Sequence, residues 1–194
     1  MKRPVRSNRK DVSAPNNVFK IPKLSHFQTV TTSACKRVFS NAHSYHINSI
    51  SINCDGQTFL SSDDLRINLW HLDDNSESFT VVDIKPPNLE ELTEVITCAN
   101  FHPSQCNIML YGSSRGSIRL ADLRDSALCD QHSKVFAAED EPNSKNFFTE
   151  ITNSVSDVKV AENGRYIISR DFLTLKLWDV NMESRPVTLR NIEM

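Results

Sequence analysis

The histidine residues are the first candidates for chemistry, because imidazole is a common general base and metal ligand in proteins. Their spacing forms neither an HxH nor an HxxxH pair, and no Walker loop or GxSxG turn accompanies them. The Asp, His and Asn clusters by which metallophosphatases hold two metal ions are also missing. We therefore expect no enzymatic activity, no catalytic residue, no bound metal and no cofactor. The histidines in question are His26, His43, His46, His71, His102 and His132.

A short amphipathic segment is a better candidate for binding than for catalysis. Asn88 is a favourable N-cap and two acids follow it, so the sequence predicts a short helix over residues 89–96. The side chains that share one face of this helix are Leu89, Leu92 and Ile96, with Val95 beside them. Spacing alone favours packing of this face on the rest of the domain. The alternative is an apolar groove that receives a partner.

Two further features could contact a partner or serve only the fold. Asp64 lies in a predicted turn, where its carboxylate either bonds to nearby backbone or to His43, or receives a basic residue of a partner. Phe147 and Phe148 follow an acidic, polar loop. They either pack into the next strands or remain exposed as an aromatic anchor.

Charge is distributed unevenly along the chain. Residues 1–37 hold nine basic residues and one acid, which leaves 13 basic and 23 acidic residues in 38–194. The basic segment contains scattered prolines and few aromatics, so we predict a largely disordered, solvated tail and not a nucleic-acid-binding arm. The acidic remainder suits basic partners.

The cysteines and the hydropathy pattern bear on the cellular compartment. The five cysteines include no CxxC pair, and the N-terminus carries charge without an apolar run. No window approaches the roughly 20 apolar residues of a membrane-spanning helix. We therefore expect reduced thiols in an intracellular protein, located in the cytoplasm or also in the nucleus.

A recurring strand ending organises the rest of the chain. Residues 61–72 place a turn before a strand of alternating apolar and polar residues, and similar endings recur at 117–123 and 174–180. Trp70 and Ala121 are 51 residues apart, and Ala121 and Trp178 are 57 apart. A four-stranded unit with a period of about 40–45 residues and a Trp-Asp ending is typical of a WD40 propeller blade.

This pattern predicts an all-β fold, a WD40 β-propeller fragment of about three blades over residues 38–194. The blades are expected at roughly 38–84, 97–136 and 151–190, and the longer spacings imply insertions at 85–96 and 137–150. In WD repeats a His, a turn Asp and a Trp commonly form a hydrogen-bonded lattice, for which His43, Asp64 and Trp70 have suitable spacing. His71 and Ala121 depart from the Trp-Asp ending. The residues that we assign to the WD pattern are His43, Trp70, Trp178 and Asp179.

Several long runs carry a closer similarity. They are Asn41–Ile50, Asp63–Leu72, Val82–Pro86, Glu90–Thr97 and Ser126–Asp130. Through these runs, residues 38–188 resemble the B55 (PR55) regulatory subunit family of protein phosphatase 2A. The family's fold is a seven-bladed propeller that sits on a helical-repeat scaffold and presents substrates to the catalytic subunit. The resemblance thus implies three partners: the scaffold (A) subunit, the catalytic (C) subunit, and phosphoproteins with basic segments. Neither nucleic acid nor membrane is expected as a partner.

The resemblance also assigns a substrate-binding role to residues at one end of the propeller, and it favours the groove over simple packing for residues 89–96. The positions that match are Tyr45, His46, Asp64, Leu89, Glu90, Leu92, Val95, Phe147 and Phe148. They imply an acidic, partly apolar groove on the top face of the propeller.

The length of the chain departs from the family pattern. It has room for about three blades, and three blades cannot close into a ring that removes its strand edges. We therefore expect a truncated isoform, a partial gene copy or a fragment. The alternative hypotheses are a WD40 interaction module without phosphatase association and a poorly folding truncated product.

Overall fold

The computed structural model describes residues 29–129, 134–138 and 147–192. The chain divides into two compact units, Met1–Val38 and Phe39–Met194. The described part of the first unit, residues 29–38, forms neither helix nor strand. The disorder predicted for residues 1–37 concerns mostly residues outside the described ranges, and the polar loop at 139–146 lies wholly outside them.

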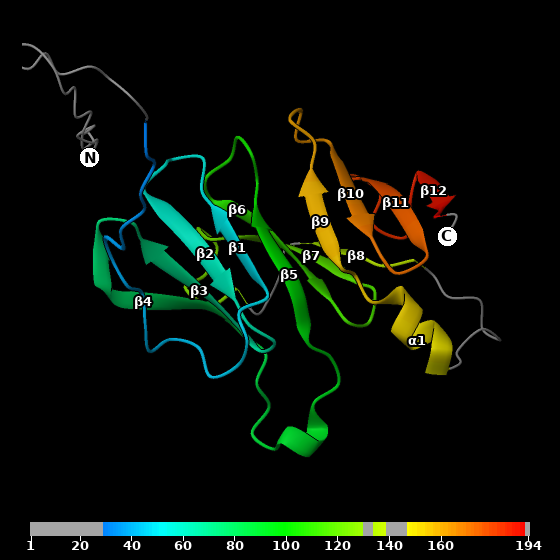
Figure 1. The fold of residues 1–194 in the computed structure, drawn as a ribbon. Helices are drawn as coiled ribbons and strands as arrows, with labels where there is room; N and C mark the ends of the chain where they lie inside the picture. The colour runs from blue at the N-terminus through cyan, green and yellow to red at the C-terminus, as the bar shows by residue number, and fades with distance from the viewer. Residues whose placement is uncertain (1–28, 130–133, 139–146, 193–194) are drawn as a thin grey trace, which may run out of the picture. The chain divides into compact units, whose positions relative to one another are not determined.

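The second unit contains three four-stranded antiparallel sheets, each with its strands in sequence order (Figure 1). Sheet A consists of β1 Ser49–Ile52, β2 Thr58–Ser62, β3 Arg66–His71 and β4 Asp74–Asp83. Sheet B consists of β5 Ile96–Phe101, β6 Ile108–Ser113, β7 Ile118–Asp122 and β8 Lys134–Phe136. Sheet C consists of β9 Asp157–Val160, β10 Tyr166–Arg170, β11 Thr174–Asp179 and β12 Thr188–Asn191. Two short helical segments accompany them, the 3-10 helix η1 Leu89–Glu91 and the α-helix α1 Phe147–Asn153.

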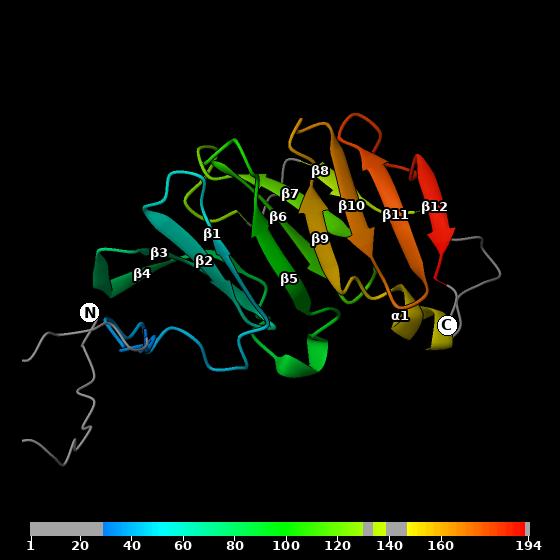
Figure 2. The ribbon, with the colours of Figure 1, turned by 45° about the horizontal axis from the view of Figure 1, so that its top comes forward.

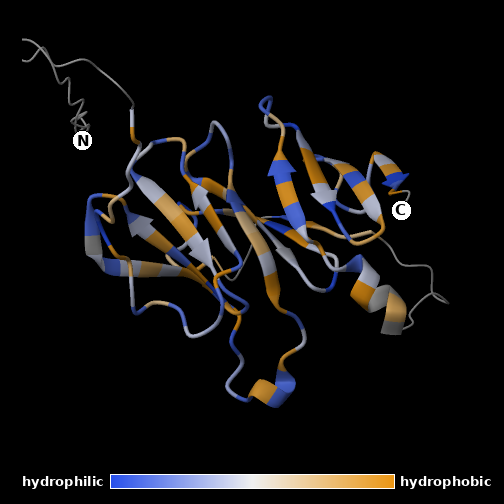
Figure 3. Ribbon diagram, viewed as in Figure 1, coloured by the Kyte–Doolittle hydropathy of each residue, from blue (hydrophilic) through white to orange (hydrophobic). Residues whose placement is uncertain are grey.

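Local turn chemistry fixes the first hairpin of sheets A and C. Between β1 and β2, the Asp55 carboxylate accepts hydrogen bonds from the backbone N–H groups of Gln57 (2.7 Å) and Thr58 (3.0 Å). Gly56 has a φ of 65°, a conformation that residues with a side chain rarely adopt. Gly164 (φ 69°) takes the same part between β9 and β10. These turns set the register in which apolar side chains alternate along the strands (Figure 3).

The sheets pack face against face, with sheet B between A and C (Figure 2). One apolar cluster joins sheets A and B and includes Leu60, Ile67, Phe101 and Met109. A second joins sheets B and C around Leu110, Ile118, Ile167 and Trp178. Because each sheet buries its faces only against its neighbours, the core consists of two repeated interfaces and has no single centre.

Sheets B and C approach each other closely at Gly112. A Cβ atom at this position would lie 2.7 Å from Val155 Cγ1 and 2.9 Å from Cys98 Sγ. Real Cβ contacts are longer, so the close approach of β6 to sheet C requires glycine here.

The three antiparallel four-stranded sheets confirm the prediction of an all-β, partial propeller. The insertion at 85–96 is present between sheets A and B, although its helix is shorter than predicted. Among the described helices, none is long and apolar enough to cross a membrane.

Candidate protein-interaction site

The loops at one end of the three sheets are joined by backbone hydrogen bonds. The Ile96 N–H donates to the Asp64 carbonyl (2.8 Å), which ties the insertion to the β2–β3 turn. Val95 and Ser114 are joined twice, through Ser114 N–H to the Val95 carbonyl (2.9 Å) and Val95 N–H to Ser114 Oγ (3.1 Å). The insertion is therefore held against both neighbouring turns, and its exposed part has a fixed base.

An ion pair also ties the insertion at residues 85–96 to strand β7 of sheet B. Glu94 pairs with Arg119, and both side chains are largely buried. The Arg119 guanidinium also lies over the Tyr111 ring, 5.8 Å from its centroid. Burial acts to lower the pKa of Arg119, but the Glu94 carboxylate outweighs it and raises that pKa above its usual range. Among the described residues Arg119 Nε has no hydrogen-bond partner, and the guanidinium bonds to Glu94 through Nη2.

The helix predicted over residues 89–96 is wrong in extent. Only Leu89–Glu91 form a 3-10 turn, with the Asn88 side chain accepting from Glu90 N–H (3.2 Å). Leu92 already has an extended backbone (ψ 117°), and from Val95 onward the backbone pairs with neighbouring turns. These outside hydrogen bonds replace the i to i−4 bonds that a longer helix would need.

The apolar stripe predicted on that helix is therefore not formed. Ile96 is buried as the first residue of β5, whereas Leu89 (52% exposed) and Leu92 face solvent. Glu90 and Glu91 are exposed beside them, and Val95 is half-buried. The segment thus presents two leucines and two acids on a short, fixed projection between sheets A and B.

The buried acid of the β2–β3 turn is Asp63, not Asp64. Asp63 is 1% exposed, and its carboxylate accepts from His43 Nδ1–H (2.8 Å) and from the backbone N–H groups of Leu65 and Arg66. The lattice that we predicted with Asp64 is therefore formed by its neighbour. The Asp64 side chain is half-buried.

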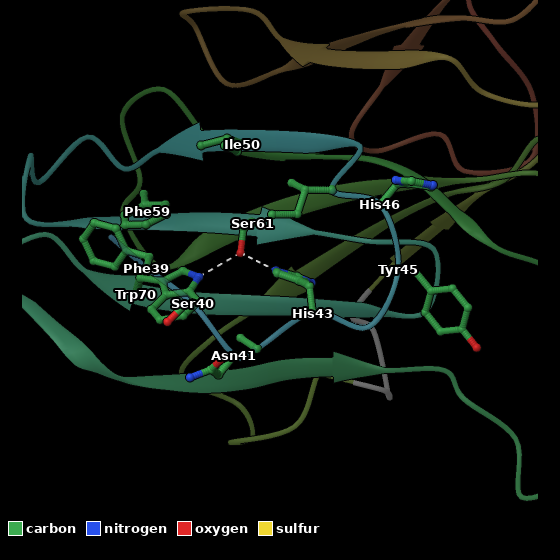
Figure 4. Close-up of a pocket in the computed structure, with 12 residues that line it drawn as sticks. Phe39, Ser40, Asn41, His43, Tyr45, His46, Ile50, Phe59, Ser61 and Trp70 are labelled. Carbon is green, nitrogen blue, oxygen red and sulfur yellow. Dashed lines mark hydrogen bonds between the residues drawn. The ribbon is translucent and has the colours of Figure 1, made fainter. Parts of the chain in front are cut away.

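A serine links the other members of the lattice. The Trp70 indole N–H donates to Ser61 Oγ (2.8 Å), which lies 2.6 Å from His43 Nε2 (Figure 4). The Asp63 carboxylate accepts from His43 Nδ1, and His43 Nε2 and the Ser61 hydroxyl share the next hydrogen bond. Trp70, Ser61, His43 and Asp63 thus form one continuous chain of hydrogen bonds across sheet A.

Sheet C repeats part of this lattice with different residues. Trp178 donates to Ser169 Oγ (2.9 Å), and the buried Asp171 accepts from Leu173 and Thr174 in the following turn. Lys176 pairs with Asp171 (2.9 Å). In sheet C a lysine thus contacts the buried aspartate, as His43 contacts Asp63 in sheet A. Asp179, next to Trp178, instead pairs with Arg165 (2.9 Å).

Sequence reasoning missed the two serines and the acids that follow them. The signal is present, because Ser61 and Ser169 each precede a tryptophan by nine residues and an aspartate by two. Sheet B lacks this pattern, since Tyr111, Ser113 and Ala121 occupy the positions of the serine, the aspartate and the tryptophan.

Tyr45 and His46 are exposed in the segment that leads into β1. Both line a cavity of about 590 Å³ that also includes Ile50, Phe59 and Trp70 (Figure 4). Tyr45 also borders a small cavity with Arg66 and Lys85, next to the β2–β3 turn. The structure thus places Tyr45 near the turn that carries Asp64, whereas His46 lies on the open face of sheet A.

Phe148 is 77% exposed on α1, and the side chain of Phe147 lies outside the described set. Helix α1 ends against the turns of sheets B and C, where Thr152 accepts a backbone hydrogen bond from Phe172 (3.2 Å). Close by, a Cβ on Gly116 would lie 2.9 Å from the Asn153 carbonyl oxygen. Phe148 therefore lies at the same end of the sheets as Asp64 and η1, but on the sheet C side.

Within the described ranges, no group of three or more His, Cys, Asp and Glu side chains is placed to hold a metal ion. The exposed leucines, acids and aromatics are suited to protein contacts. The three four-stranded antiparallel sheets define the class of protein, a WD-repeat protein with a partial propeller.

Comparisons with known proteins agree with this class. Residues 33–71 match the family model described as "WD domain, G-beta repeat". The regulatory subunit phr2AB of serine/threonine-protein phosphatase 2A from Dictyostelium discoideum is 63% identical over 169 residues, 87% of this chain and 35% of that protein. The regulatory subunit sur-6 from Caenorhabditis elegans is 56% identical over 182 residues, 94% of this chain and 37% of that protein.

A third relative is a 55 kDa regulatory subunit of the same phosphatase, the beta isoform from Carassius auratus. It is 53% identical over 192 residues, 96% of this chain and 43% of that protein. Within the WD-repeat proteins, this chain therefore belongs with the 55 kDa (B55) regulatory subunits of protein phosphatase 2A, to part of which it corresponds. The chain spans less than half the length of these relatives.

Proposed function

We propose that this chain is a non-catalytic regulatory component of protein phosphatase 2A that recruits phosphoprotein substrates. The sequence identity of 53–63% to regulatory subunits of that phosphatase, over nearly the whole chain, carries the proposal. In this proposal the scaffold and catalytic subunits are the partners of the chain, and only the catalytic subunit carries out the dephosphorylation.

The projection at 89–92 and the Asp64 turn form the proposed substrate surface. Leu89 and Leu92 offer apolar contact, while Glu90, Glu91 and Asp64 offer negative charge to a basic segment. The hydrogen bonds between Ile96 and Asp64 and between Val95 and Ser114 hold this surface in place, so a partner loses little free energy in ordering it. Tyr45 and Phe148 would lie at its margins.

A pull-down tests the assembly. The 194-residue chain is immobilised and offered purified scaffold and catalytic subunits, and retention of both is expected. If neither is retained, the chain is a WD-repeat interaction module without phosphatase association.

A binding titration tests the substrate surface separately, with a phosphopeptide flanked by Lys and Arg as the probe. Asp64→Lys should weaken its capture about tenfold, which corresponds to about 1.4 kcal/mol. The fold should tolerate the change, because sheet C holds Phe172 at the same turn position. The matched control is Glu162→Lys, which reverses an exposed charge in the β9–β10 turn, at the other end of the sheets. Equal capture by both variants would contradict the proposed surface.

A further inference from the structure

Two cysteines from different sheets meet where the first turns of sheets A and B lie side by side. Cys54 is exposed in the β1–β2 turn, and Cys106 is half-buried in the β5–β6 turn. Both are free thiols in this structure. Because successive turns of an antiparallel sheet alternate between its two ends, this pair lies at the end away from the β2–β3 turn that carries Asp64.

The buried side chain of Asn53 joins the backbones of the two cysteines. Its Oδ1 accepts a hydrogen bond from the Cys54 N–H (2.8 Å), and its Nδ2 donates to the Cys106 carbonyl (2.9 Å). One amide group thus lies between the two backbones. Disulfides join residues whose Cα atoms are about 4.4–6.8 Å apart, so a spacing of this order suits them.

The two cysteine side chains also interact with each other. The pKa of Cys54 is raised, first by loss of solvation and then by the charge of the neighbouring Cys106 thiol. Hydrogen bonding between the two side chains acts in the same direction. The sulfur atoms of the pair are therefore within reach of each other.

The inner strands of sheets A and B hold the two turns in this arrangement. The Ala99 N–H donates to Ser49 Oγ (2.8 Å), and the Phe101 N–H donates to Ser51 Oγ (3.0 Å). These bonds join β1 to β5 along their length, and the turns that carry the cysteines follow directly after the two strands. The meeting of the thiols is thus a consequence of how the sheets pack.

We propose that Cys54 and Cys106 form a reversible disulfide that links sheets A and B, with a low-molecular-weight disulfide such as oxidised glutathione as the oxidant. The thiolate of one cysteine attacks a sulfur of the oxidant, breaks its S–S bond and releases one glutathione. The other cysteine loses its proton and attacks the cysteine sulfur of this mixed disulfide, which releases the second glutathione. The protein thiols give up two electrons and two protons, and these convert the oxidant into two thiols.

The disulfide would close a loop over residues 54–106, which contains the β2–β3 turn and the projection at 89–92. Such a link restricts the unfolded chain more than the folded one, so it stabilises the contact between the two sheets. Cys98 and Cys129 are buried and thus shielded from the oxidant. This inference does not depend on phosphatase association.

A redox titration of the 194-residue chain with mixtures of reduced and oxidised glutathione tests the proposal. Peptide mapping by mass spectrometry should find Cys54 linked to Cys106, with the loss of two hydrogen atoms. When total glutathione is diluted about tenfold at a fixed ratio of its two forms, the ratio of linked to reduced chain should rise by the same factor. The reason is that an internal disulfide releases two glutathione molecules. A mixed disulfide releases only one, so its proportion would not change.

Serine variants provide the controls. Cys54→Ser and Cys106→Ser should each abolish the linked product, whereas Cys35→Ser removes another exposed thiol and should leave it unchanged. The oxidised parent should unfold at a higher urea concentration than the reduced parent, and neither Cys54→Ser nor Cys106→Ser should show this shift. Glutathione adducts on both cysteines, a disulfide between two chains, or a lower urea midpoint after oxidation would overturn the proposal.

Discussion

Asp63 and Asp64 are adjacent acids with different surroundings, and the difference decides which of them serves the fold. Asp63 accepts three hydrogen bonds inside the protein, one of them from the imidazole of His43. Asp64 contributes its backbone carbonyl to the insertion and leaves its side chain at the surface of the turn. The Asp63 carboxylate is therefore part of the fold's hydrogen bonding, whereas the Asp64 side chain belongs to the proposed substrate surface.

Alanine substitutions should separate these roles. Asp63→Ala leaves buried donors without an acceptor and should lower the free energy of unfolding by about 3 kcal/mol. Asp64→Ala should change it by no more than about 0.5 kcal/mol, as surface substitutions usually do. Urea titration followed by circular dichroism measures both values. Equal losses would show that the two carboxylates share the structural role.

At this scale the sequence predicted the large, rare residues better than the small, common ones. His43 and Trp70 were recognisable from spacing, whereas Ser61 and Asp63 were not chosen. Two adjacent aspartates follow two adjacent serines at 61–64, and both serines are buried, but only the folded turn after β2 decides that Asp63 is buried and Asp64 is not. That information comes only from the folded chain.

At the scale of elements, hydrogen bonds to neighbours overrode a local helical preference in the insertion. The cap at Asn88 was correctly placed, yet the turn that it starts ends after three residues. The sequence around Val95 gives no sign that Ser114 will bond to it, because the two residues meet only after sheet B has formed. Long-range pairing of this kind is beyond a reading of local periodicity.

His102 connects sheet B to the β9–β10 turn of sheet C. It is buried, its Nδ1 accepts from the backbone N–H groups of Ser104 (3.2 Å) and Gln105 (3.1 Å), and its ring approaches Gly164. Burial lowers the pKa of His102 below 6.5, although contact with the Gly164 backbone acts in the other direction. A proton on Nδ1 would point at the two backbone N–H groups that now donate to this nitrogen. The folded state therefore favours the neutral ring.

The free energy of unfolding should therefore depend on pH through this residue. Because the unfolded chain binds the proton more readily, the contribution of His102 is complete above about pH 6.5 and declines as the pH falls below it. Urea titrations between about pH 7.5 and 5 would measure the slope. His102→Gln should show a shallower slope, and His71→Gln, at an exposed histidine, serves as the control. An unchanged slope in His102→Gln would contradict the assignment.

For the whole molecule, the repeating strand rhythm was enough to predict a partial propeller. The alternation of apolar residues and the turn residues are local signals that span only a few positions, so they can be recognised in a single sequence. Which strand residues are exposed within the described ranges could not be predicted this way. Ile50 and Ala99 read alike as inner-strand residues, and only the packing of sheets shows that one is exposed and the other buried.

Because Cys98 lies at the close contact with Gly112, the rate at which its thiol is alkylated reports how often sheets B and C separate. Its thiol is buried against Gly112 and Val155, and burial raises its pKa to about 11, so a thiol reagent meets little thiolate while the interface is closed. Cys98 should therefore be alkylated much more slowly than the exposed Cys35, at a rate set by the opening of sheets B and C.

Mass spectrometry of pulse-alkylated chains would give both rates. Gly112→Ala forces an added methyl group into that contact, at a cost of about 1–3 kcal/mol, and should speed alkylation of Cys98 but not of Cys35. Comparable rates for the two thiols in the parent would mean that the blades part freely. The same residue would then report, on the minute-to-hour timescale, whether binding of a partner holds neighbouring blades together.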